Sequence, residues 1–304
     1  MLNEVEHISV CICTYKRPTL LKRLLSTLAT QETEGLFEYS VVIVDNDRNE
    51  SARQVAKSAA IEFKTAVKYC VEPEQNIALA RNKAVKESAG NFLAFIDDDE
   101  FSGKYWLLNL YKSFHEFKAD GVLGPVKPHF EIEPPRWIVN GKFCERQAFQ
   151  TGTIIHNAKH TRTGNVLFTR NIFVDKERWF DPLFGRTGGE DVDFFKRMMQ
   201  RGKVFVWCNE AYVKESVPPE RLTRSYFLRR ALLRGVANSE KVSLLSLNVL
   251  KSIVAFVLYT AMLPLLLLLV WRHDLFMKYL IRNCDHAGKV LALCGLKVVN
   301  QRDS

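Results

Sequence analysis

The sequence lacks the signs of a secreted, disulfide-bonded or zinc-binding protein. Its cysteines number seven, and none of them has the paired spacing with a second Cys or His pair that a zinc site requires. Residues 1–7 are polar and contain neither the basic stretch nor the apolar stretch of a secretory signal. We therefore expect reduced cysteines in a cytosolic protein.

A glycine-rich loop is also missing after the first predicted strand. Nucleotidyltransferases normally place a glycine-rich, basic phosphate loop at this point, but residues 14–18 read Thr-Tyr-Lys-Arg-Pro. This absence argues against nucleotidyl transfer.

The first 200 residues have no excess of either charge, since 27 basic and 27 acidic groups balance. Residues 201–304 hold 16 Lys and Arg against 7 Asp and Glu, which accounts for the whole net charge of +9. A basic tail on a neutral body favours a local anionic partner, such as lipid headgroups or phosphates, over a nucleic-acid groove. We expect no nucleic-acid partner.

Short apolar runs alternate with amphipathic stretches over residues 8–96. The β-branched run at 8–13 predicts a strand, and Pro18 followed by leucines at three- and four-residue spacing predicts a helix. Further strands are expected at 39–44, 66–71 and 92–96, and further helices at 51–60 and 77–88. This alternation predicts an α/β fold with right-handed crossovers and a mainly parallel sheet flanked by helices.

Polar residues follow the predicted strands, where the ligands of such sheets gather. Thr14 and Tyr15 follow the first strand, and Asp45 follows the second. The fourth strand runs into four consecutive acids at 97–100. We expect a functional site at this edge of the sheet.

The four acids repel one another and raise one another's pKa. A divalent cation such as Mg²⁺ or Mn²⁺, held by one or two carboxylates and a diphosphate, would relieve this repulsion. The alternative is a solvated acidic turn at the start of a helix, where acids suit the helix dipole.

The alternation loosens after residue 124. Prolines interrupt the chain at 125–135, and 151–164 is rich in Gly, Thr and His, which is typical of a lid or binding loop. A strand is expected again at 165–168, a helix after 188–193, and a late strand at 204–207.

Residues 253–271 form a run of nineteen residues without a charged side chain, long enough to cross a bilayer's hydrocarbon. Two alternatives stay open. One is a buried core helix, and the other is a segment kinked at Pro264 that enters one leaflet and returns.

Five motifs occur together in one order, at residues 12–18, 42–46, 76–82, 90–99 and 189–193. With them the chain resembles the family-2 glycosyltransferases of the GT-A fold, the inverting type that builds bacterial surface polysaccharides. The resemblance covers residues 8–205, and the joint order is more specific than any single motif.

The resemblance implies a nucleotide-sugar site. Thr14 and Tyr15 resemble the shelf for the nucleotide base, and Asp45 resembles the acid that accepts a hydrogen bond from uracil, which favours a UDP-linked donor. Arg81 resembles the arginine that supports the nucleotide and the acids, although an ordinary ion pair is the alternative.

The acids at 97–99 resemble the family's DxD motif. Asp97 matches the first acid, which reaches the ribose or diphosphate, and Asp99 matches the second, which holds the metal, with Asp97 as a further ligand. Asp98 lies between them and is assigned to the nucleotide-sugar site. The expected cofactor is Mn²⁺ or Mg²⁺.

Glu190 and Asp191 resemble the catalytic pair. Asp191 is the expected base that takes the proton from the acceptor hydroxyl, and Glu190 places it or the acceptor; the reverse assignment stays open because adjacent acids titrate together. A helix N-cap is the structural alternative for Asp191.

The chain departs from the family at Ala78, where glycine is common. It also lacks the Gln-x-x-Arg-Trp motif of processive members, which favours transfer of one sugar per encounter.

The resemblance predicts a catalytic domain, 1–215, and the basic charge and apolar run after it predict a basic linker with a membrane-associated helical tail, 216–304. Residues 1–120 are the expected nucleotide-sugar half of the domain and 121–215 the acceptor half. The expected function is transfer of a hexose from a UDP-sugar to a glycan or lipid-linked acceptor at the cytoplasmic face of the inner membrane. The alternative is an inactive nucleotide-binding scaffold at the membrane.

Overall fold

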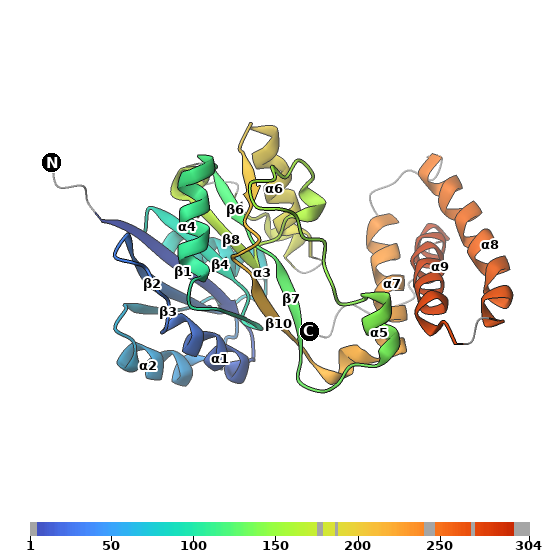
Figure 1. The fold of residues 1–304 in the computed structure, drawn as a ribbon, viewed down its shortest axis with the longest axis horizontal. Helices are drawn as coiled ribbons and strands as arrows, with labels where there is room; N and C mark the ends of the chain where they lie inside the picture. The colour runs from blue at the N-terminus through green and yellow to red at the C-terminus, as the bar shows by residue number, and fades with distance from the viewer. Residues whose placement is uncertain (1–4, 175–178, 186–187, 240–246, 269–270, 295–304) are drawn as a thin grey trace. The chain divides into compact units, whose positions relative to one another are not determined.

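The computed structural model describes residues 5–174, 179–185, 188–239, 247–268 and 271–294. The chain divides into two compact units (Figure 1). The first contains residues 1–128 and 146–216, and the second contains residues 129–145 and 217–304.

A central seven-stranded sheet with the order β3-β2-β1-β4-β8-β6-β9 forms the first unit. Its strands are β1 Glu6–Thr14, β2 Phe37–Asp45, β3 Val67–Val71, β4 Phe92–Ile96, β6 Gly121–Leu123, β8 Asn165–Thr169 and β9 Phe205–Trp207. The pairs β1-β2, β1-β4, β2-β3 and β6-β9 are parallel, whereas β8 runs antiparallel to both β4 and β6. The predicted α/β fold with a mainly parallel sheet is confirmed.

Helices cover this sheet and leave the carboxyl ends of β1, β2 and β4 at one edge (Figure 1). They are α1 Pro18–Leu28, α2 Arg53–Glu62, α3 Ile77–Glu87, α4 Trp106–Phe117 and α6 Glu190–Gln200, with short 3₁₀ turns at Ala158–His160, Arg170–Phe173 and Pro182–Phe184.

Local sequence explains where these helices begin. Pro18 occupies the first turn of α1, and the predicted leucine spacing buries Leu21, Leu24, Leu25 and Leu28. Asn76 caps α3, because its side-chain oxygen accepts hydrogen bonds from the backbone N–H groups of Ala78 and Leu79.

A smaller sheet with the order β5-β10-β7 was not predicted. It joins β5 Glu100–Ser102, which directly follows the acids, to β10 Val213–Val217 and β7 Val126–Phe130. Strand β10 pairs antiparallel with β5, so Glu215 lies opposite Glu100.

The second unit contains α5 Arg136–Gly141, α7 Arg224–Ser239, α8 Leu247–Leu267 and α9 His273–Leu293, with a 3₁₀ turn at Pro219–Leu222. Residues 129–145, which we assigned to the acceptor half of the catalytic domain, cluster by their contacts with the second unit. The reason is aromatic packing. The ring centroid of Phe143 lies 5.4 Å from that of Trp137 and 5.6 Å from that of Phe227.

Helix α8 contains most of the apolar run at 253–271, with Pro264 inside the helix. Residues 269–270 of that run lie outside the described residues. Among the described parts of the chain, none of the helices combines the length and the apolar character needed to traverse a membrane.

Candidate active site

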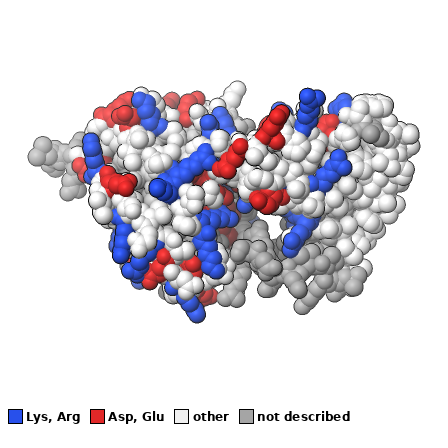
Figure 2. All heavy atoms as spheres, turned by 90° about the horizontal axis from the view of Figure 1, so that it is seen from below, with Lys and Arg blue, Asp and Glu red and all other residues white. Residues whose placement is uncertain are grey.

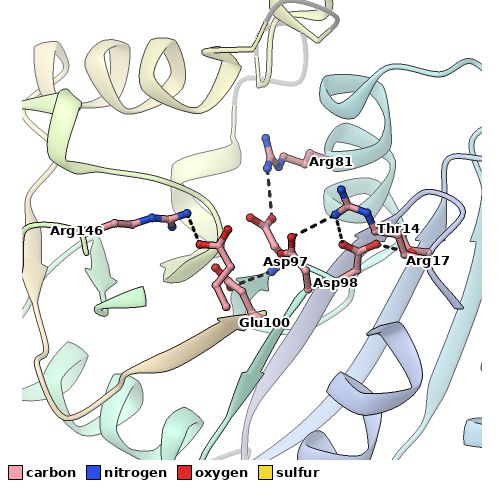
Figure 3. A network of polar contacts seen from close by, with 9 residues as sticks. Thr14, Arg17, Arg81, Asp97, Asp98, Glu100 and Arg146 are labelled. Carbon is pink, nitrogen blue, oxygen red and sulfur yellow. Dashed lines mark hydrogen bonds and ion pairs between the residues drawn. The ribbon is translucent and has the colours of Figure 1, made fainter. Parts of the chain in front are cut away.

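The acids after β4 form the centre of a polar network (Figure 3). Thr14 donates a hydrogen bond of 2.8 Å from Oγ1 to Oδ2 of Asp98, which is buried. Arg17 approaches Asp98 at 3.1 Å and Asp99 at 3.3 Å. The backbone N–H of Asp97 donates to the Glu100 carboxylate at 3.2 Å. Asp97 is the most open of the four, with 47% of its side chain exposed.

The crowding of these acids changes their protonation. Burial raises the pKa of Asp99 to about 7, and the negative charges of Asp97 and Asp98 add to the effect. Burial raises the pKa of Glu100 well above its usual value for the same reasons, with Asp97 and Asp99 as neighbours. The site therefore lacks enough positive charge of its own, and a bound cation would stabilise the ionised carboxylates.

Arg81, on α3, joins two of the five motifs. Its guanidinium forms an ion pair with Glu190 and approaches Asp97 at 3.5 Å. Burial opposes the charge on Arg81, but Glu190, Asp97 and Asp191 outweigh it and raise the pKa of Arg81 above its usual value. Acids almost a hundred residues apart in the chain thus meet at one cation (Figure 3 shows the Asp97 side).

Helix α6 starts at Glu190 and presents the second acid pair. Gly189 is the N-cap, with a φ of 99° that favours glycine, so Asp191 is not the N-cap that the structural alternative required. Asp191 is half-buried, and its Oδ1 accepts a hydrogen bond of 2.7 Å from the backbone N–H of Val192. Glu190 is buried, and burial raises its pKa although Arg81 opposes this.

The residues predicted to hold the nucleotide base lie at the ends of β1 and β2. Tyr15 is half-buried directly after β1, and the Lys16 ammonium lies 4.9 Å from the centre of its ring. Asp45 ends β2 and is fully buried, where it accepts hydrogen bonds from the backbone N–H groups of Asp47 and Ala52 and from the Tyr69 hydroxyl. Asp45 therefore shapes the turn after β2.

Two arginines at the site were missed by the sequence analysis. Arg17 contacts the acids from α1's N-cap position, and Arg146 pairs with Glu215 beside Glu100 (Figure 3). The motif at 12–18 contains Arg17, so its position after β1 was a usable signal. The pairing of Arg146 with Glu215 depends on the small sheet, and no signal in the sequence indicated it.

The carboxylates suit a divalent cation that takes most of its ligands from a substrate. Among the described residues, no group of three or more His, Cys, Asp or Glu side chains is arranged to hold a metal by itself. Mg²⁺ and Mn²⁺ in nucleotide enzymes are commonly held by one or two carboxylates and the substrate's phosphates. Asp99 and the exposed Asp97 are a donor set of this kind.

A Rossmann-like sheet with acids and arginines at its carboxyl edge defines a class of enzyme that binds a nucleotide-linked substrate. Residues 9–173 match the family model described as glycosyl transferase family 2. The chain belongs to this family and is a glycosyltransferase.

The relatives agree with this assignment. The chain is 35% identical over 239 residues to the succinoglycan biosynthesis protein ExoM of Rhizobium meliloti, covering 77% of this chain and 75% of that protein. It is 23% identical to the hyaluronan synthase of Pasteurella multocida, covering 71% of this chain but only 25% of that larger protein.

Solved structures show the same fold. The crystal structure of S. aureus TarS residues 1–349 in complex with UDP aligns with a TM-score of 0.55 at 17% identity, covering 98% of this chain and 94% of that one. The structure of GalNAc-T7 with UDP, GalNAc and Mn²⁺ aligns with a TM-score of 0.57 at 12% identity, covering 79% of this chain and 52% of that one. The predicted GT-A fold is confirmed, and enzymes of this fold typically use a divalent metal.

Proposed function

We propose that this glycosyltransferase moves a hexose from a UDP-sugar to a glycan or lipid-linked acceptor in the synthesis of a cell-surface polysaccharide, with inversion at the anomeric carbon. The observation that carries the proposal is the contact of Arg81 with both Asp97 and Glu190. This contact brings the acids that would face the diphosphate next to the acids that would face the acceptor. The ExoM and TarS relatives support a polysaccharide product and a UDP-linked donor.

Asp191 is the proposed base. Its carboxylate takes the proton of the acceptor hydroxyl while that oxygen bonds to the anomeric carbon. The bond from this carbon to UDP breaks on the opposite face, and UDP leaves with the electron pair. Glu190 positions the acceptor side, and its Oε2 is buried without a hydrogen-bond partner among the described residues.

Thr14, Tyr15, Asp45 and Asp98 are the proposed residues of the nucleotide site. Arg17 and Arg81 balance the negative charge there. Asp99 and Asp97 would hold Mn²⁺ or Mg²⁺, which would neutralise charge on the departing diphosphate.

Hydrolysis of the donor tests this function without knowledge of the acceptor. Purified protein with Mn²⁺ should slowly release UDP from at least one UDP-sugar, and Asp99→Ala should abolish the release. Lys57→Gln, an exposed charge change on α2, is the control and should have no effect. UDP binding without release from any common UDP-sugar would instead indicate the inactive scaffold.

We also propose that the second unit associates with the cytoplasmic face of the inner membrane through α8. One side of α8 packs on α9, where Ser252 and Leu266 are buried. The other side exposes apolar residues, and Figure 2 shows a mostly uncharged surface over the C-terminal helices on the face it presents. These residues are Ile253, Val254, Val257, Leu258, Met262, Leu265 and Leu267.

The charges near this surface favour an anionic lipid as its partner. Lys251, Arg272, Lys278 and Arg282 are exposed on α8 and around α9. A helix with an apolar face and flanking basic residues can lie in the interface of a membrane, where burial of apolar area and attraction to anionic lipids add together.

Flotation with vesicles that contain phosphatidylglycerol tests the membrane proposal. The double variant Val257→Glu/Leu258→Glu should lower the bound fraction about tenfold or more, since two charges would enter the lipid. Ile61→Glu is the matched control, because Ile61 is 84% exposed on α2 in the first unit. Equal binding of all three proteins, or no binding by any, would contradict the proposal.

A further inference from the structure

A basic cavity of about 180 Å³ lies in the first unit. Arg146, Lys159, His160 and Arg162 line it, and Trp207 forms part of its wall. The described residues that line it include no carboxylate. The cavity therefore concentrates positive charge in a unit whose sequence is otherwise balanced.

Arg162 is the unusual member of this group. Arg146 is neutralised by its ion pair with Glu215, but Arg162 has no ion pair or hydrogen bond among the described residues. Burial and the charge of Arg146 lower the pKa of Arg162, although Glu100, Asp191 and Glu215 oppose this effect. A half-buried guanidinium without a hydrogen-bonded partner is costly unless a ligand supplies one.

Trp207 adds a second unused donor at the cavity. Its indole N–H is buried and has no acceptor among the described residues. Buried polar groups are normally hydrogen-bonded, so this donor in the wall of the cavity is an exception.

The position of the cavity assigns it to the acceptor half of the site. Trp207 ends β9, at one edge of the central sheet, and Arg162 lies just before β8. The residues proposed to contact the nucleotide base, Thr14, Tyr15 and Asp45, lie at the ends of β1 and β2, on the other side of β4. The 3₁₀ turn Ala158–His160, which supplies two of the lining side chains, nevertheless contacts α6, and the first turn of α6 carries Asp191.

We propose that this cavity binds an anionic group of the sugar acceptor, a carboxylate or a phosphate, through Arg162 with Lys159 at its rim. The inference rests on the proposed transfer and names the class of acceptor. An arginine fork binds either anion in a bidentate manner, and the anion would hold the acceptor with a hydroxyl toward Asp191.

Binding of simple glycosides tests this inference. The probes are p-nitrophenyl glucuronide, glucose 6-phosphate and the neutral p-nitrophenyl glucoside, each titrated by calorimetry into protein saturated with UDP and Mn²⁺. At least one anionic probe should bind about tenfold or more tightly than the glucoside, and which one does so distinguishes carboxylate from phosphate. Equal affinity of all three for the unmodified protein would overturn the inference.

Variants then locate the binding. Arg162→Gln should remove the preference for the anion, Arg162→Lys should keep part of it because the charge remains, and Lys159→Gln should reduce it while changing only an exposed side chain. Lys196→Gln, an exposed charge change on α6, is the control and should leave the preference unchanged. An undiminished preference in both Arg162→Gln and Lys159→Gln would overturn the inference.

Donor hydrolysis separates this inference from the proposed function. Arg162→Gln should release UDP with the same donor KM as the unmodified protein, because the cavity serves the acceptor. A raised donor KM would assign the cavity to the donor sugar and overturn the inference. If the unmodified protein released no UDP from any UDP-sugar, the proposed function would be refuted. The glycoside affinities would still report on the cavity.

Discussion

At the scale of single residues, Glu190 and Asp191 are neighbours in the chain with different surroundings. Glu190 is buried against Arg81, whereas Asp191 is half-buried and its carboxylate accepts a hydrogen bond from the first turn of its own helix. Substitution of each should therefore have a different effect.

Asp191→Asn should lower the rate of sugar transfer by about 10²–10⁴-fold, which is the usual contribution of a general base. Its unfolding midpoint in urea should stay close to that of the unmodified protein. Glu190→Gln should lower both the rate and the midpoint, because it leaves the buried Arg81 with weaker compensation. An unchanged transfer rate in Asp191→Asn would exclude it as the base.

The raised pKa values at the acid cluster predict how stability depends on pH. The folded pKa of Asp99 is about 7, above the value expected in the unfolded chain, so the folded state holds this proton more tightly. Its contribution to the free energy of unfolding is present below the unfolded pKa and is lost as pH rises through about 7.

We therefore expect metal-free protein to be less stable at about pH 8 than at about pH 5, and Asp99→Asn to reduce this difference. Urea unfolding with a chelator present measures it. Glu116→Gln, at an exposed position on α4, is the control and should keep the full difference. The same change in the free energy of unfolding between pH 5 and pH 8 in the unmodified protein and in Asp99→Asn would contradict the expectation.

Residue types and order predicted that certain acids and one arginine would lie close together, but not every partner of these side chains. Arg81, Asp97 and Glu190 were expected from three separate motifs, and they meet. The Arg146 to Glu215 pair was not expected, because the side chains are 69 residues apart and meet only through the small sheet. Periodicity carries no information about such long-range contacts.

At the scale of elements, β8 approaches the acids more closely than a side chain would allow. A Cβ placed on Gly164, just before β8, would lie 2.7 Å from Oε1 of Glu100 and 2.8 Å from Oδ2 of Asp97. Only glycine fits there without moving a carboxylate.

Gly164→Ala should displace Asp97 and Glu100, lower donor hydrolysis, and cost about 1–3 kcal/mol of stability through overpacking. Gly103→Ala is the matched control, since a Cβ there meets nothing within 4 Å. Hydrolysis rates and urea midpoints of the two variants measure the effect. Equal behaviour of both would show that the acids tolerate a methyl group.

Elements with strong local signals were predicted well. The strand at 92–96 has the expected bounds, and α1 follows Pro18 through Leu28 as the leucine spacing indicated. Strands β5, β7 and β10 were missed because each is short or polar and exists only through pairing across about a hundred residues. The antiparallel direction of β8 likewise follows from the path of the chain and not from its composition.

At the scale of the whole molecule, the second unit is assembled from two separate stretches of chain. Phe227 lies 5.6 Å from both Trp137 and Phe143 between ring centroids, and the cluster also buries Ile138 and Leu222. Residues 129–145 therefore depend on the C-terminal part of the chain for their packing.

Phe227→Ala should cost the second unit about 3–5 kcal/mol and change the fluorescence of Trp137. UDP affinity should be unchanged, because the proposed nucleotide residues belong to the first unit. Leu36→Ala, at a position 46% exposed, is the control for loss of apolar surface. Loss of UDP affinity in Phe227→Ala would show that the two units do not respond independently.

The double contact of Arg81 constrains how this enzyme could be re-engineered. A chimera that takes its donor portion from one relative and its acceptor portion from another would separate Asp97 from Glu190, although both neutralise the same guanidinium. Such a graft would have to carry over Arg81 and both carboxylates as one inherited set. Exchange of either portion alone would leave a buried charge unmatched before any sugar arrived.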